Sequence, residues 1–161
     1  MSALPIIKSP GAALRKRSGW EDALRGLAFG LMGAPWSWGR TDCHAFALRA
    51  LDAMTGADTY GRIRGRYHDE ATALETYHEF GDVSRHLDAF GLYEVPEHAF
   101  GDLVIFSSVR APSFPWPGTV PAVSMSKGLV MMPTGRKPIL QLAPARAIGQ
   151  ILKVMRVCRA Q

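Results

Sequence analysis

The amino-acid sequence predicts a single α+β domain in which helices pack on a C-terminal antiparallel sheet or small barrel. Apolar residues in the first half of the chain recur at the three- and four-residue spacing of helices. After Gly101 the apolar runs become short and alternate with turn residues, as in a meander of strands. Helices first and an antiparallel sheet afterwards is the order of α+β proteins. With 161 residues, 47% of them apolar, the chain suffices for one such core.

The first nineteen residues differ in character from the rest. Prolines interrupt them twice and a basic cluster follows at residues 15–17, so residues 1–19 are expected to form an extended basic arm. The domain itself is predicted to be residues 20–161. Its helices are expected at residues 20–31, 43–55, 70–80 and 82–90.

The second of these helices has the clearest boundaries. Thr41 or Asp42 is its predicted N-cap, and Gly56 is the glycine expected just after its C-terminus. Cys43 then lies in the first turn, on the apolar stripe of the helix.

The strands are predicted from the second half of the chain. They are expected at residues 101–108, 122–126, 128–133, 139–143 and 151–157, with a helical turn near residues 145–150. An irregular loop is expected where four prolines, Pro112, Pro115, Pro117 and Pro121, follow one another.

Charge is distributed unevenly along the chain. All fourteen acidic residues lie at or before Asp102, and residues 103–161 carry only basic charges. Such a segment meets an acidic protein, a phosphate or an anionic polymer, or else it is neutralised internally by the acidic helices of the first half. The composition allows both readings.

Several classes of protein are disfavoured. Two distant cysteines without a CxxC pair or a nearby histidine pattern predict reduced thiols, no zinc site and no cofactor. No apolar run is long enough for a signal sequence or a membrane span, so synthesis in the cytoplasm is expected. The sequence pI of about 9.6 suits nucleic acid, but no helix-turn-helix, RNA-recognition motif or zinc finger accompanies the charge. Nucleic-acid binding is therefore an unlikely function.

Cys43 is the candidate for chemistry. A thiol at a helix N-terminus has a lowered pKa and becomes a better nucleophile, whereas a cysteine on an apolar stripe is also an ordinary small core residue. Trp36 and Trp38 flank it and are candidate binding residues, either as a sugar-stacking wall, as groove filling or as a protein contact. Phe114 and Trp116, on the proline-rich loop, are candidate binding anchors or a local cover over the sheet.

The order of motifs resembles a known family. The segments "PWSWGRTDCHAFALRALDAMTGADTYGRIRGRY", "GDLVIF" and "ILKVMRV" follow one another as in NlpC/P60 papain-like cysteine peptidases. They are most similar to the divergent branch encoded in tail gene clusters of phages and gene transfer agents. The resemblance covers residues 20–158 and implies a papain-like fold with Cys43 as the nucleophile position.

The catalytic histidine that this resemblance implies is absent. The family places it at the start of the strand after "GDLVIF", where this chain has Pro121 or Ala122, and no histidine follows His98. His44 is adjacent to Cys43 and points about 100° away on a helix. His68, His78 and His86 are expected on solvated loops or polar helix faces. His98 is the remaining candidate base.

The resemblance implies two alternative functions. One is a structural docking component of a phage-like tail tip, located in the virion, whose partners are other tail-tip or hub proteins and whose catalytic site has degenerated. The other is an active peptidoglycan endopeptidase that cleaves the cell wall during genome entry, with Cys43 as nucleophile. The missing histidine favours the first.

Overall fold

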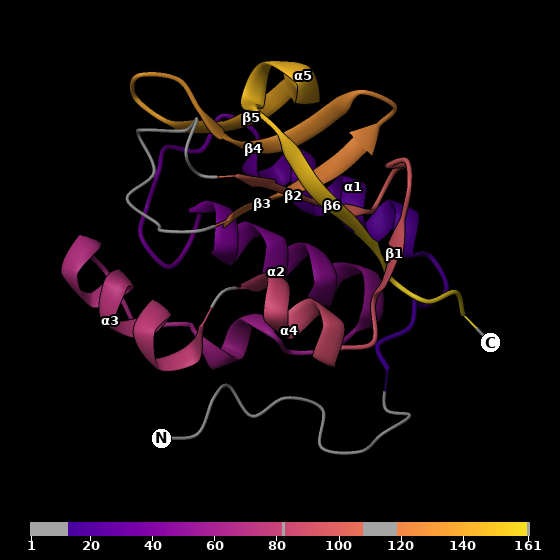
Figure 1. Ribbon diagram of the computed structural model, residues 1–161, viewed down its shortest axis with the longest axis horizontal. Coiled ribbons are helices and arrows are strands. Elements are labelled where there is room, and N and C mark those ends of the chain that lie inside the picture. The colour runs from indigo at the N-terminus through magenta and orange to yellow at the C-terminus, as the bar shows by residue number, and fades with distance from the viewer. Residues whose placement is uncertain (1–12, 82, 108–118, 161) are drawn as a thin grey trace.

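The computed structural model describes residues 13–81, 83–107 and 119–160, and these segments form a layered arrangement of helices on an antiparallel sheet (Figure 1). In chain order the elements are α1 (Trp20–Leu31), α2 (Cys43–Thr55), the 3-10 helix η1 (Tyr60–Arg62), α3 (Glu70–Phe80), α4 (Val83–Ala89), β1 (Tyr93–Val95), β2 (Leu103–Ser107), β3 (Thr119–Ser126), β4 (Leu129–Thr134), β5 (Ile139–Pro144), α5 (Ala145–Ile148) and β6 (Ile151–Arg156). The α+β prediction is confirmed, and all four predicted helices are present.

The sheet has six strands in the order β1-β6-β2-β3-β4-β5, and every neighbouring pair is antiparallel. Successive side chains of a strand point to opposite faces, so the sheet presents two sets of residues. One face packs against α1 and α2 through residues such as Leu103, Val123 and Met155. The other set of strand side chains, such as Val104, forms a smaller apolar cluster that also contains Ala145 of α5 and Cys43 at the start of α2. Figure 1 shows α5 and α2 on opposite sides of the sheet.

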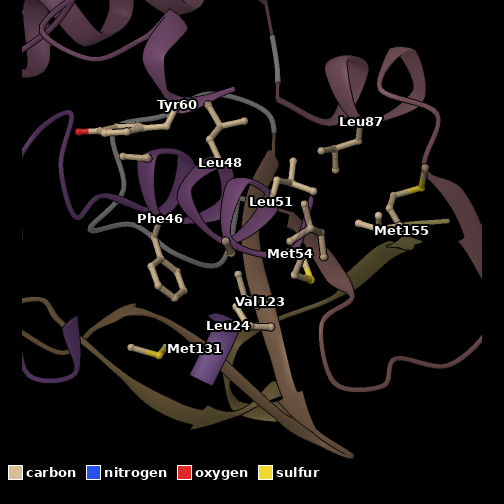
Figure 2. Close-up of a cluster of buried hydrophobic side chains, with 14 of the residues drawn as sticks. Leu24, Phe46, Leu48, Leu51, Met54, Tyr60, Leu87, Val123, Met131 and Met155 are labelled. Carbon is tan, nitrogen blue, oxygen red and sulfur yellow. The ribbon is translucent and has the colours of Figure 1, made fainter. Parts of the chain in front are cut away.

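Helix α2 is the centre of the larger core. Phe46, Leu51 and Met54 are completely buried along it, and Figure 2 shows them in one cluster with Leu24 of α1 and Val123 of β3. Burial of each such side chain contributes about 1.5–3 kcal/mol of transfer free energy. The apolar stripe that predicted this helix is therefore the surface on which the fold is assembled.

One expectation about the strands was wrong, and one strand was missed. Pro121 lies inside β3 rather than in a loop, where it is paired with Ile105 of β2. Proline has no N–H to donate to a neighbouring strand. The pairing of β3 with β4 extends only from Val123 to Ser126, so no β4 carbonyl oxygen needs a donor at Pro121. Strand β1 was not predicted, because three residues are too few for an alternating pattern and the strand exists through its pairing with β6.

The structure also bears on the predicted positions of His86 and of the remaining prolines. His86 is 4% exposed and lies against Phe90 at a ring distance of 6.3 Å, so its predicted solvated position was wrong. Pro112, Pro115 and Pro117 lie outside the described residues. No helix in the described segments is long and apolar enough to cross a membrane.

Candidate functional site

The N-terminus of α2 is organised by the side chain of Asp42. Its Oδ1 accepts a hydrogen bond from the backbone N–H of Ala45 at 3.0 Å, so Asp42 is the N-cap, one of the two predicted residues. Its Oδ2 accepts from the Gly39 N–H at 2.6 Å, and the Tyr67 hydroxyl donates to the same oxygen at 2.9 Å. The carboxyl group is 1% exposed, and burial raises its pKa.

Gly39 fits this network because it has no side chain. Its φ of 75° lies in the left-handed region, and a Cβ there would lie 2.6 Å from the Tyr67 carbonyl oxygen. The Tyr60 hydroxyl donates to the Gly39 carbonyl oxygen at 2.6 Å. Two tyrosines from the segment after α2 thus fix the turn that precedes it.

The Cys43 side chain follows the cap and is directed into the smaller apolar cluster. It is 2% exposed, and its neighbours in this cluster are apolar side chains from strands β2, β3, β4 and β6 and from α5. Burial raises the pKa of the Cys43 thiol well above its ordinary value, and the charge of Asp42 adds to the shift. These effects exceed the helix-terminus effect expected from sequence, so the thiol stays protonated at neutral pH.

The sequence resemblance would place a histidine at Pro121 or Ala122 of β3, and Ala122 belongs to the same cluster. Ala122 of β3 is 1% exposed and pairs with Val104 of β2. Its side chain is a methyl group, which cannot accept a proton. The cluster therefore offers the thiol apolar contacts and no proton acceptor from this strand.

His98 lies on the loop between β1 and β2, and its ring contacts a different residue. Its Nδ1 is 2.6 Å from the Oγ of Ser124, which is fully buried in β3. The ring lines a cavity of about 920 Å³ together with residues such as Phe100, Met125 and Lys127. The Nδ1 of His98 is thus engaged with a hydroxyl group of β3.

Trp36 and Trp38 form part of the structure around the helix start. Their rings meet edge to face at 5.1 Å, and Trp38 also meets the Tyr67 ring edge at 6.4 Å. The Trp36 N–H donates to the Pro138 carbonyl oxygen at 2.9 Å, which fastens this loop beside β5. Both side chains are half-buried, so each packs on its neighbours and keeps part of its ring exposed.

The two other binding candidates, Phe114 and Trp116, lie outside the described residues. Within the described segments, no group of three or more histidine, cysteine or acidic side chains is arranged to hold a metal ion. Both cysteines are free thiols; Cys158 is half-buried and its Sγ donates to the Gly91 carbonyl oxygen at 3.4 Å.

Sequence reasoning missed two groups that shape the molecule. Tyr67 was quoted only as the last residue of the family pattern, yet it bonds the helix cap. Asp102 is completely buried, and its two oxygens accept from the Nε of Arg156 at 2.9 Å and from its Nη2 at 2.7 Å. The sequence does contain a hint of this pair, because Asp102 is a single acidic residue at the start of an apolar strand and Arg156 lies in a basic final strand.

The fold and the residues around Cys43 define an α+β protein with a buried thiol at the start of its central helix. The chain belongs to the family described as "Domain of unknown function (DUF6950)", which matches residues 15–148. This range contains every helix of the described structure and strands β1 to β5. No curated protein and no solved structure has significant similarity to the chain.

Proposed function

We propose that this protein is a structural docking component of a phage or phage-like tail tip, built on a degenerate NlpC/P60 papain-like fold. The motif order in the sequence supports the relationship. The arrangement of elements agrees with it, since a helix that begins with the cysteine packs against the strands that follow "GDLVIF". In this proposal the protein acts in the virion through protein contacts.

The observation that carries the loss of catalysis is the environment of Cys43. A cysteine peptidase needs a thiolate and a general base within hydrogen-bond reach. Here the thiol is buried among apolar side chains, its pKa is raised, and Pro121 or Ala122 stands where the resemblance would place the histidine. His98, the remaining candidate base, bonds Ser124.

The basic surface of the second half supports a docking role. Two of its cations are neutralised internally, Lys153 by Asp88 at 3.6 Å and Arg156 by Asp102 at 2.7 Å. Four others, Lys127, Arg136, Lys137 and Arg146, are exposed and form no ion pair within the described part of the chain. Both readings of the charge pattern therefore hold in part, and the exposed cations suit an acidic protein partner.

The first experiment tests for catalysis. Purified muropeptides are incubated with the protein and with Cys43→Ala, and the products are identified by mass spectrometry. We expect no cleavage by either protein. Cleavage by the wild-type chain that is lost in Cys43→Ala would overturn the proposal in favour of a peptidoglycan endopeptidase.

A second experiment measures the thiol directly. Iodoacetamide is added at pH 7.5 to Cys43→Ala and to Cys158→Ala, so that each protein retains one thiol. The chain that retains Cys43 should react far more slowly, because its thiolate fraction is smaller and its Sγ is buried. Faster alkylation of Cys43 than of Cys158 would contradict a vestigial role.

The location is tested on particles. Antibodies against the protein, with gold labels, should mark one end of the tail of particles released from producing cells. A protein that remains entirely with the cell lysate after the particles are purified would refute a virion role, whatever the state of Cys43.

A further inference from the structure

The two ends of the described chain lie side by side, which brings two basic segments together. Arg15 forms a parallel bridge with Cys158, and the Lys16 N–H donates to the Cys158 carbonyl oxygen at 2.9 Å. The sequence showed a basic cluster near the start and an all-basic second half, but it gave no reason to join them. The fold places Lys16 beside the basic residues at the end of β6.

These residues line a hollow in the surface. It has a volume of about 370 Å³, and its charged lining consists of Lys16, Arg156 and Arg159. Trp20 and Phe100 form an aromatic wall, with ring centroids 5.4 Å apart. A hollow of this size holds a small ligand, and its walls combine an apolar surface with a few convergent polar groups, as ligand sites do.

The charges in the hollow are not balanced. Asp102 is completely buried, accepts two hydrogen bonds from Arg156 and a third from the Ala99 N–H at 2.8 Å, and so compensates one cation. Glu21, exposed at the start of α1, is the other acid whose charge acts on Lys16. Lys16 and Arg159 have no ion pair within the described segments.

The Lys16 ammonium is held in place rather than extended into solvent. Its Nζ lies 4.1 Å from the centre of the Trp20 ring, in a cation–π contact. Burial lowers the pKa of Lys16, and the charges of Arg156 and Arg159 lower it further, while Asp102 and Glu21 act in the opposite sense. The three cations are therefore close enough to repel one another, and an anion between them would relieve the repulsion.

We propose that Lys16, Arg156 and Arg159 form a binding site for a phosphate group, either free or carried as the terminal phosphate of a larger molecule. A terminal phosphate brings a charge of about −1.5 to −2 at pH 7 and three acceptor oxygens. It thus matches two uncompensated cations, whereas a carboxylate brings a single charge. The Arg159 guanidinium can bind phosphate oxygens in a bidentate manner, and Lys16 adds a point charge. Arg156, whose Nε and Nη2 bond Asp102, contributes to the positive field of the hollow. The site is independent of the tail-tip proposal.

The binding test uses the full chain and inorganic phosphate at constant ionic strength, measured by isothermal titration calorimetry. We expect saturable binding that becomes on the order of tenfold weaker in Lys16→Met and in Arg159→Gln, because each loses a charge-assisted contact. Lys137→Met and Arg136→Gln remove the same charges from the exposed turn between β4 and β5 and should bind as the wild type does. Equal weakening in both pairs of variants would overturn the site.

A second measurement needs no variant. Trace labelling with acetic anhydride, followed by mass spectrometry, gives the acylation rate of each lysine. Bound phosphate should slow acylation of Lys16 and leave Lys137 unchanged, because it raises the pKa of the nearby amine and covers it. If phosphate at a saturating concentration leaves the Lys16 rate unchanged, the proposal is wrong.

Two further ligands show whether the site takes free phosphate or the terminal phosphate of a larger molecule. Glycerol 3-phosphate should bind as tightly as inorganic phosphate if the natural ligand is a terminal phosphate of a larger molecule, and markedly more weakly if the site takes the free ion. Acetate, a monoanion, should bind more weakly than both. Acetate binding as tight as that of phosphate would refute a phosphate site.

Discussion

At the scale of single residues, the turn before α2 depends on one glycine. Gly39 has a φ of 75°, donates its N–H to Asp42 and accepts from the Tyr60 hydroxyl, all within the short loop that carries Trp36 and Trp38. A side chain at this position meets two separate obstacles. One is the left-handed backbone, and the other is the Tyr67 carbonyl oxygen.

Gly39→Ala should therefore destabilise the protein by more than backbone strain alone. Gly65→Ala is the matched control, because Gly65 has the same φ of 75° but nothing lies within 4 Å of the position of its Cβ. We expect the free energy of unfolding to fall by about 1–2 kcal/mol in Gly65→Ala and by at least twice that amount in Gly39→Ala. Urea denaturation of the three proteins measures the difference. Equal losses would mean that the loop moves away from Tyr67 at little cost.

At the scale of secondary-structure elements, the buried ion pair joins the start of β2 to the end of β6. Arg156→Met leaves the Asp102 carboxylate buried without its cation, so the free energy of unfolding should fall by about 3–5 kcal/mol. Asp102→Asn combined with Arg156→Met should recover part of this loss, because the buried charge is gone.

The control for this prediction lies on the same strand. Lys153→Met removes a pair with Asp88, whose side chain is 65% exposed, so its effect should stay below about 1 kcal/mol. Chemical denaturation at pH 7 gives all three values. If Lys153→Met costs as much as Arg156→Met, the two pairs contribute alike and burial of Asp102 is not the reason.

Helix α3 allows a prediction about pH. Asp69 is its N-cap. Two hydrogen bonds lower the pKa of Asp69, the larger effect coming from the Thr72 hydroxyl and the smaller from the Thr72 N–H. A lowered pKa means that the folded chain binds fewer protons at this site than the unfolded chain. The resulting stability is complete above the unfolded pKa of about 3.9 and is lost as the pH falls through the folded value.

Asp69→Asn keeps a capping oxygen but does not titrate. The wild type should be more stable than this variant at pH 6, and the advantage should shrink at pH 3. Thermal denaturation at the two pH values gives the comparison. The same difference at both values would show that the charge of Asp69 contributes nothing to the cap.

The elements also show which parts of the fold were predictable. The boundaries of α2 were local: an apolar stripe, Asp42 before it and Gly56 after it, whose φ is 76°. Strand β1 has no local signal, since it is held by pairing with a strand about sixty residues later, and Pro121 is tolerated in β3 because the β4 ladder stops short of it. Local chemistry therefore predicted the helices, and long-range pairing determined the remaining details.

The same distinction holds for the site. The sequence identified Cys43 and its capping residue, because both belong to one helix start. It suggested an activated thiol, whereas the apolar cluster that contains Cys43 is built from four strands and α5 and could not be read from residues 35–56. The resemblance to a peptidase family pointed to Pro121 or Ala122 as the place of the expected histidine, and Ala122 lies in the same apolar cluster as the thiol.

At the scale of the whole molecule, the N-terminal arm is part of the fold from residue 13 onwards. The Leu14 N–H donates to the Phe90 carbonyl oxygen at 2.8 Å, and the Arg17 N–H donates to that of Met54 at 2.9 Å. Ala13 lies so close to Gly91 that a Cβ on the glycine would overlap it. The arm thereby connects α2, the end of α4 and the last residues after β6.

Removal of this segment should lower the stability of the domain, because α2, the end of α4 and the residues after β6 all lose contacts with the arm. A chain that starts at Ser18 loses four backbone hydrogen bonds, three donated by the arm and one donated by the Trp20 N–H to the Arg17 carbonyl oxygen, each worth about 1 kcal/mol. It also loses the packing of Leu14 on the core. The released chain regains conformational entropy, which offsets part of this loss. For a domain of this size, a net loss of about 2 kcal/mol lowers the Tm by roughly 4–8 °C.

The matched control is a chain that starts at Ala13, which retains every contact of the arm described above. Calorimetry should place its Tm several degrees above that of the chain that starts at Ser18. The shorter chain also lacks Lys16, so a lost phosphate response alone would be ambiguous; Lys16→Met in the longer chain separates the two effects, because it removes the ammonium and keeps the backbone bonds. If both truncated chains melt together, the arm rests on the domain without stabilising it, and its role must be sought in contacts with a partner.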